Sequence, residues 1–220
     1  MKTNIMKYLV IHTTDSPFDR EITPDDLYKW HLGPRKNSDG TFTFKGVVYT
    51  KEQLKGKKLT LPSGIVVNAI DIQGNGWKQV GYSDLIQRSG QLVNLVPYND
   101  NNVIDSAEVT NGAAGYNSIS RHVALAGGWT QDKTIKNGKN PKTGEYLLPE
   151  ELYTEKQLET LKRYIIAQKS LVPDVIVVGH NQLSQKTCPN FDVKKFLTSS
   201  RFLVRPLKPK TINKINLEQK

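Results

Sequence analysis

The chain has 220 residues, of which 37% are hydrophobic, and it carries a formal net charge of +10 at pH 7. This length suffices for one sizeable domain, and no apolar run approaches the ~18 residues that span a bilayer. A single cysteine excludes an internal disulfide framework, and the N-terminus shows no recognisable signal peptide, so we expect synthesis in the cytoplasm. The charge predicts attraction to polyanions: nucleic acid, an acidic membrane surface or an anionic cell-wall polymer.

Half of the positive excess lies near the C-terminus, where residues 201–220 hold six basic residues and one acidic residue. We interpret residues 198–220 as a basic C-terminal tail. A solvated appendage is the simplest role for such a charge run, and a binding arm is the alternative. The sequence contains no recognised DNA- or RNA-binding motif, so nucleic acid is the least favoured partner.

The first predicted elements are a buried strand and an amphipathic helix. Residues 8–11 read Tyr-Leu-Val-Ile, a short apolar strand that delivers His12 at its end. Thr23 is a favourable N-cap, because a proline follows it and Asp26 lies three residues on, where its carboxylate can complete a capping box. The helix ends at a Gly-Pro pair and places three side chains on one face: Leu27, Trp30 and His31.

Residues 33–76 are a looser segment with strand-like pieces. The alternation of Thr and Phe over residues 41–44 predicts a strand, residues 46–49 are its candidate hairpin partner, and residues 65–67 are a further short strand. The segment carries seven basic and three acidic residues, and its aromatic residues and valines need burial. We therefore predict an ordered β-rich insertion and not a disordered linker.

A β-hairpin is predicted next, with strands over residues 80–87 and 91–96 around a turn that ends at Gly90. After a polar, glycine-rich loop, residues 121–126 form another apolar strand. The succession of strands and helices predicts an α/β fold: a single domain with a central mixed β-sheet flanked by helices.

The last third of the chain repeats the arrangement of a strand followed by a histidine. Thr154 opens a capping box and a helix with three apolar side chains on one face, and that helix leads into residues 175–178, a run of Val and Ile typical of a buried strand. His180, Lys186 and Cys188 follow in one polar loop, before a short helix predicted for residues 191–196.

His12, His180 and Cys188 would converge if the two histidine-bearing strands were neighbours in one sheet. Two imidazoles and a thiolate suit zinc, and a catalytic zinc site keeps its fourth position open for water. The spacing by itself leaves two alternatives: a nucleophile pair made by Cys188 and His180, and structural histidines at strand ends.

Several stretches of the chain, in their order, carry a family resemblance: YLVIHTT, GYSDLIQRSG, GAAGYNSIS, RHVALAGG and GHNQLSQKTCPNFD. They resemble the zinc-dependent N-acetylmuramoyl-L-alanine amidases of the phage-lysozyme type, a family that includes the peptidoglycan recognition proteins. The resemblance covers most of residues 7–197 and implies the α/β fold of that family. We therefore assign residues 1–197 to an amidase catalytic domain with a β-rich insertion at about 33–76.

The resemblance also implies roles for particular residues. His12, His180 and Cys188 would bind Zn²⁺. Tyr82 would hydrogen-bond near the zinc-bound water, and Lys186 would stabilise the oxyanion. The implied reaction is hydrolysis of the amide bond between N-acetylmuramic acid and L-alanine in bacterial peptidoglycan, and the cysteine favours an active enzyme because non-catalytic recognition proteins typically lack it.

Two features depart from the family pattern. Gly112 stands where phage-type members often carry a histidine, and the 33–76 insertion is longer than the expected link. Neither His31 nor His122 is assigned to the metal: the first lies on the apolar face of a helix and the second lies within a strand, so core or rim roles are the default for both.

Two other functions stay open at this point: a peptidoglycan-recognition module without turnover, and a cysteine hydrolase. The missing signal peptide favours a bacteriolytic phage or prophage endolysin, which is made in the cytoplasm and acts on the cell wall. A bacterial autolysin or recycling amidase is the alternative. The basic tail could contact anionic wall polymers.

Overall fold

The computed structural model describes residues 4–199, and a five-stranded mixed sheet lies at its centre. The strand order is β10-β1-β9-β7-β8, in which β8 alone is antiparallel to its neighbour. The predicted α/β class with a mixed central sheet is therefore confirmed. The strands of this sheet are β1 (Tyr8–Thr13), β7 (Asp84–Ile86), β8 (Leu92–Asn94), β9 (Ser120–Leu125) and β10 (Ile176–Gly179).

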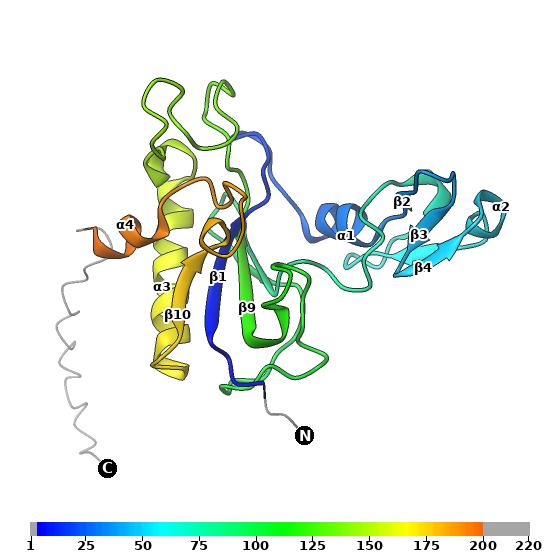
Figure 1. Cartoon of the computed structure of the whole chain (residues 1–220), viewed down its shortest axis with the longest axis horizontal. Coiled ribbons are helices and arrows are strands. Elements are labelled where there is room, and N and C mark those ends of the chain that lie inside the picture. The colour runs from blue at the N-terminus through cyan, green and yellow to red at the C-terminus, as the bar shows by residue number, and fades with distance from the viewer. Residues whose placement is uncertain (1–3, 200–220) are drawn as a thin grey trace, which may run out of the picture.

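One face of the sheet is covered by the long helix α3 (Glu155–Leu171), as Figure 1 shows. The predicted capping box starts it, since the Thr154 hydroxyl accepts from the Gln157 N–H while the Gln157 side chain accepts from the Thr154 N–H. Side chains of β1 and β9 on this face pack against the helix in one buried cluster, where each aliphatic side chain contributes about 1.5–3 kcal/mol. The cluster includes Leu9, Ile11, Val123, Leu125, Leu158, Leu161 and Ile165.

The opposite face packs against α1 (Pro24–Leu32) and the segment that follows it. Thr23 and Asp26 form the predicted capping box at the start of α1. Because side chains alternate along a strand, the residues of β1 and β9 that face away from α3 include both strand histidines. They are Val10 and His12 of β1, and His122 and Ala124 of β9.

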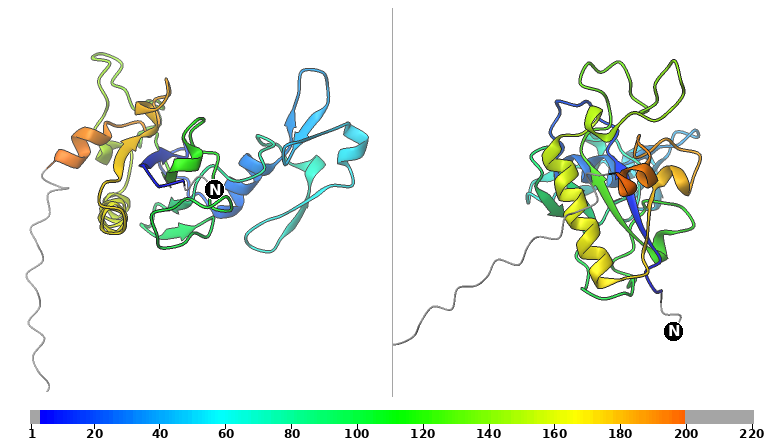
Figure 2. Two further views of the ribbon diagram at one scale, coloured as in Figure 1. Left: turned by 60° about the horizontal axis from the view of Figure 1, so that its bottom comes forward. Right: turned by 90° about the vertical axis from the view of Figure 1, so that its left-hand side faces the viewer.

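The 33–76 segment stands to one side of the sheet (Figures 1 and 2). The predicted hairpin forms from β3 and β4, and the strand predicted at residues 65–67 corresponds to β6, which pairs with β5, a strand that was not predicted. Leu54 and Leu59 lie in the same apolar cluster as α1, so the segment extends this core. Its elements are β2 (Arg35–Lys36), β3 (Phe42–Phe44), β4 (Val47–Tyr49), α2 (Lys51–Leu54), β5 (Lys58–Thr60), β6 (Val66–Asn68) and the 3₁₀ helix η1 (Ala69–Asp71).

Several predicted boundaries shift by one or more residues. β1 continues through His12 to Thr13, because the ladder with β9 extends to the pair Thr13 and Leu125. The first hairpin strand is limited to β7, and α4 (Val193–Thr198) begins two residues after the predicted start. Most of the predicted tail, residues 200–220, lies outside the described residues.

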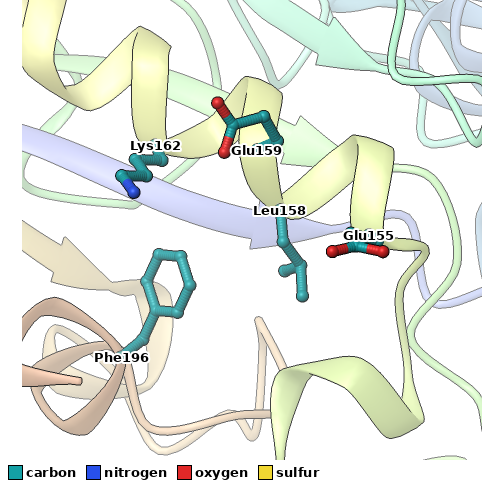
Figure 3. Close-up of a pocket in the computed structure, with 5 residues that line it drawn as sticks. All are labelled: Glu155, Leu158, Glu159, Lys162 and Phe196. Carbon is teal, nitrogen blue, oxygen red and sulfur yellow. The ribbon is translucent and has the colours of Figure 1, made fainter. Parts of the chain in front are cut away.

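Loops and short helical turns connect the remaining elements. Two 3₁₀ helices, η2 (Asn117–Ile119) and η3 (Pro149–Glu151), precede β9 and α3. α3 and α4 border a shallow hollow into which Leu158 and Phe196 point (Figure 3). Among residues 4–199, no helix has the length and apolar character needed to cross a membrane.

Candidate metal centre

Two neighbouring parallel strands bring the first and last predicted site residues together. β1 and β10 pair in a register that aligns Ile11 with Gly179, so the next residues, His12 and His180, emerge side by side at the carboxyl ends of the strands. Their ring centroids lie 4.7 Å apart. The convergence expected from the sequence is therefore observed.

Hydrogen bonds fold the loop after β10 back so that Cys188 joins the two histidines. The 3₁₀ helix η4 (His180–Gln182) starts the loop, and the Asn181 N–H donates to the Cys188 carbonyl at 2.6 Å. The Asn190 amide donates to the carbonyls of Gly128 and Lys136, both at 3.0 Å. These bonds fix the cysteine from both sides.

The three side chains offer their ligand atoms to a common point. One ligand atom from each of His12, His180 and Cys188 lies within 4.8 Å of the others, and the Sγ of Cys188 is 3.5 Å from Nδ1 of His12. Tetrahedral zinc with its usual bond lengths would set a sulfur and a nitrogen ligand about 3.6 Å apart. The donor set and its spacing therefore fit zinc.

Burial keeps the three candidate ligands in their neutral forms. It lowers the pKa of His12 well below 6.5, with a further contribution from His122, and lowers the pKa of His180 to about 4, assisted by Lys186. Burial also raises the pKa of the Cys188 thiol to about 12. The imidazole lone pairs are thus available at neutral pH, and a cation that displaces the thiol proton would gain a thiolate ligand.

A cavity of about 460 Å³ opens beside these atoms. Tyr82 and Lys186, the two predicted catalytic residues, both line it. The tyrosine hydroxyl donates to the Thr13 carbonyl at 3.4 Å, and its ring lies 5.1 Å from the His12 ring. The lysine is exposed at the cavity edge. The structure thus brings all five predicted site residues together; their individual roles stay predictions.

Other lining residues were not predicted from the sequence. Trp77 stacks on His31 with ring centroids 5.0 Å apart, and Asp15 accepts a hydrogen bond from the indole of Trp129 at 3.0 Å. The backbone of Asp15 is left-handed, with φ of 51°, which non-glycine residues adopt rarely. No residue pattern in the sequence signals this left-handed backbone at Asp15.

His122 has a closer relation to the candidate ligands than its predicted core or rim role suggested. It lies 0% exposed on β9, and its Nδ1 is 2.9 Å from Nε2 of His12. Its proximity also explains the departure at Gly112: a Cβ there would overlap the His122 ring. The histidine of the strand occupies the space that a side chain from the loop would need.

Comparisons with known proteins show the family of this chain. The sequence model of a family described as N-acetylmuramoyl-L-alanine amidase matches residues 2–191. A curated relative, the endolysin of Klebsiella phage KP32, is 27% identical over 121 residues, which make up 55% of this chain and 66% of that protein. The match thus covers just under two thirds of the relative's length.

Two solved structures are similar to that of this chain. The Ph2119 endolysin from the Thermus scotoductus MAT2119 bacteriophage Ph2119 is 19% identical, with 90% of each chain covered and a TM-score of 0.47. Drosophila PGRP-LB is 18% identical, with 93% of this chain and 86% of that chain covered and a TM-score of 0.45.

Proposed function

Because the chain belongs to the N-acetylmuramoyl-L-alanine amidase family, we propose that it hydrolyses the bond between N-acetylmuramic acid and L-alanine in bacterial peptidoglycan through a zinc site. The family membership supports the enzyme class predicted from the sequence. One observation carries the mechanistic part of the proposal: two imidazoles and a thiol converge at the edge of a cavity.

His12, His180 and Cys188 would hold the zinc. Zinc bound there would lower the pKa of a water molecule towards ~7 and polarise the scissile carbonyl. The three protein ligands leave a fourth tetrahedral position for this chemistry. The cavity lies beside that position, which gives a substrate amide access to it.

Tyr82 would orient the attacking water from the β7 side of the cavity. Burial raises the pKa of its hydroxyl above 10, so the group stays protonated and can both donate and accept a hydrogen bond. In the described structure it donates weakly to the Thr13 carbonyl, at 3.4 Å. A substrate or water could replace this long bond at little cost.

Lys186 would stabilise the oxyanion that develops on the amide carbonyl. Its charge already acts on the site, since it contributes to the lowered pKa of His180. An ammonium near a partly buried centre stabilises developing negative charge more strongly than it would in water. The exposed position of Lys186 leaves its side chain able to approach a bound substrate.

The thiol argues against the cysteine-hydrolase alternative. A nucleophilic cysteine needs a lowered pKa, whereas burial raises the pKa of Cys188 to about 12. A recognition module without turnover would have no need for a complete set of three zinc-type ligands. The proposed amidase mechanism uses all three ligands.

The setting that fits best is a phage or prophage endolysin that acts on the cell wall. We propose residues 1–197 as the catalytic domain with its 33–76 insertion, and residues 198–220 as a basic tail that contacts anionic wall polymers. Exposed lysines also occur on the insertion, at positions 45, 51, 55, 57 and 58, so it offers a second basic surface.

Digestion of purified peptidoglycan tests the proposal. The protein is incubated with and without a zinc chelator, and the soluble products are analysed by mass spectrometry. We expect free stem peptides that begin with L-alanine, lost on chelation and restored by zinc. Tight binding without released peptide would instead identify a recognition module, and cleavage that survives chelation but not alkylation would identify a cysteine hydrolase.

A further inference from the structure

A buried hydrogen bond between two histidines links the candidate metal centre to β9. Nε2 of His12 and Nδ1 of His122 are 2.9 Å apart, and the two residues are 1% and 0% exposed. β9 flanks β1 on the side opposite β10, so His122 contacts His12 from the side opposite His180. The contact joins residues 110 positions apart in the chain.

The position of Cys188 decides which nitrogen of His12 is free for a metal. Nδ1 of His12 faces the cysteine Sγ at 3.5 Å, whereas Nε2 faces His122. A cation shared with the cysteine must therefore bind Nδ1. A neutral imidazole carries one proton, so that proton has to be on Nε2, where it needs an acceptor.

Nδ1 of His122 is that acceptor, and the surrounding residues hold it in place. The backbone of His122 is fixed on both sides of its peptide by Ser83: the serine N–H donates to the His122 carbonyl at 2.8 Å, and the serine hydroxyl oxygen accepts from the His122 N–H at 3.4 Å. The ring lies against Gly112, where a Cβ would overlap it. The absence of a side chain at Gly112 therefore leaves space for the ring.

The other nitrogen of His122 shows what this arrangement costs. Nε2 is buried and has no hydrogen-bond partner among the described residues. A buried polar nitrogen without a partner is destabilising, by about 1–3 kcal/mol, and such groups are rare enough in folded proteins to need an explanation. An apolar residue at position 122 would avoid this cost, but it would leave Nε2 of His12 without an acceptor.

We propose that His122 is a positioning residue for the metal centre: it accepts the Nε2 proton of His12 and so holds the Nδ1 lone pair towards the metal. The inference rests on the proposed function, because it takes zinc to be the ion that His12 binds. In the opposite arrangement, with a proton on His122 Nδ1, His12 would carry its own proton on Nδ1 and could not bind the metal. His122 therefore selects the tautomer competent for binding.

Substitutions that keep or remove the acceptor test this role. His122→Asn places an amide oxygen about where Nδ1 lies, His122→Gln moves the oxygen to about the place of Nε2, and His122→Ala removes it. Zinc affinity is measured by competition with a chromophoric chelator, and the visible spectrum of the cobalt-loaded protein reports the ligand geometry. Urea unfolding of the metal-free proteins verifies that each variant is folded.

We expect His122→Ala and His122→Gln to bind zinc about 10–100-fold more weakly than the wild type, the range for loss of a hydrogen-bond partner of a metal ligand. His122→Asn should restore most of the affinity and the wild-type cobalt spectrum. His31→Asn is the matched control, since His31 is a buried histidine that does not contact a candidate ligand, and its zinc affinity should be unchanged.

The outcomes separate this inference from the proposed function. Equal zinc affinity in the wild type and in His122→Gln overturns the positioning role, even if His122→Ala fails to fold. Weak binding by all three variants, with no recovery in His122→Asn, also overturns it, because the ring would then act by packing alone. If the wild type itself binds no zinc, the proposed function fails first.

Discussion

Two buried polar clusters lie on opposite faces of the same sheet, and they differ in how their groups are paired. Under α3, the carboxylate of Asp84 accepts from the Tyr164 hydroxyl at 2.6 Å and from the Asn94 amide at 3.0 Å, and Arg121 donates to Gln168 at 2.9 Å. At the carboxyl ends of β1 and β10, by contrast, three groups that can act as metal ligands, from His12, His180 and Cys188, offer atoms within 4.8 Å of one another.

The contrast separates buried polar groups that stabilise the fold from buried polar groups that can bind a ligand. Donors matched with acceptors stabilise the fold and leave nothing to bind a ligand. A group of acceptors without enough donors is completed by a cation. The cluster under α3 is of the first kind, and the centre formed by His12, His180 and Cys188 is of the second. The predictions below test this division.

Removal of one ligand should have the largest effect, and the effect should be on activity. We expect Cys188→Ala to lose zinc-dependent turnover by more than the roughly 100-fold that an outer partner of a ligand can cost. The unfolding free energy of the metal-free protein should fall by no more than about 1–3 kcal/mol, because the substitution removes the acceptor of one backbone N–H, that of Thr13. Turnover of released peptide and urea unfolding measure the two effects; a large loss of metal-free stability would make the cysteine structural.

A substitution in the paired cluster under α3 should instead reduce stability. Arg121 is 1% exposed and lies 3.8 Å from Glu108, so Arg121→Ala would leave a buried carboxylate without its charged partner and cost about 3–5 kcal/mol. Activity per folded molecule should be retained. The control is Arg163→Ala, which breaks an exposed ion pair with Glu159 and should change stability by at most about 1 kcal/mol. Equal losses in the two variants would contradict the division.

Acid should weaken the fold through its buried histidines. Burial lowers the pKa of His31 to about 4, from an ordinary value of 6.5, so below pH 6.5 the unfolded chain binds a proton that the folded protein does not. Stability therefore falls as pH drops from 6.5 to 4, by up to about 3 kcal/mol from this residue. In His31→Asn the unfolding free energy of the metal-free protein should depend less on pH across this window; an unchanged dependence would show that His31 titrates normally.

The sequence predicted what local signals encode. Apolar runs located the strands before His12 and before His180, and capping boxes at Thr23 and Thr154 located the starts of both main helices. The turn ending at Gly90, which has φ of 86°, located the hairpin. These elements, with the family resemblance, were enough to name the candidate ligands.

Those local signals did not predict the order of the strands in the sheet. The residues around His122 do not indicate that β9 lies beside β1, because strand pairing is set by contacts distant in the sequence. Once the order is known, alternation along β9 puts His122 on the same face as His12, and its role follows. The same limit hid the way Leu54 and Leu59 of the insertion join the core around α1.

The smallest predicted effect is a pH-dependent loss of stability in the cluster under α3. Burial raises the pKa of Asp84, and the Tyr164 hydroxyl opposes this shift by hydrogen-bonding the carboxylate. Tyr164→Phe should therefore raise the pKa further and cost about 1.5–3 kcal/mol once the carboxylate is ionised, with a smaller loss at a pH low enough to protonate it. The loss in this variant therefore grows as pH rises through the titration of Asp84. Urea unfolding of both proteins at several pH values measures the difference, and a loss independent of pH would mean that Tyr164 stabilises the fold by packing and not through Asp84.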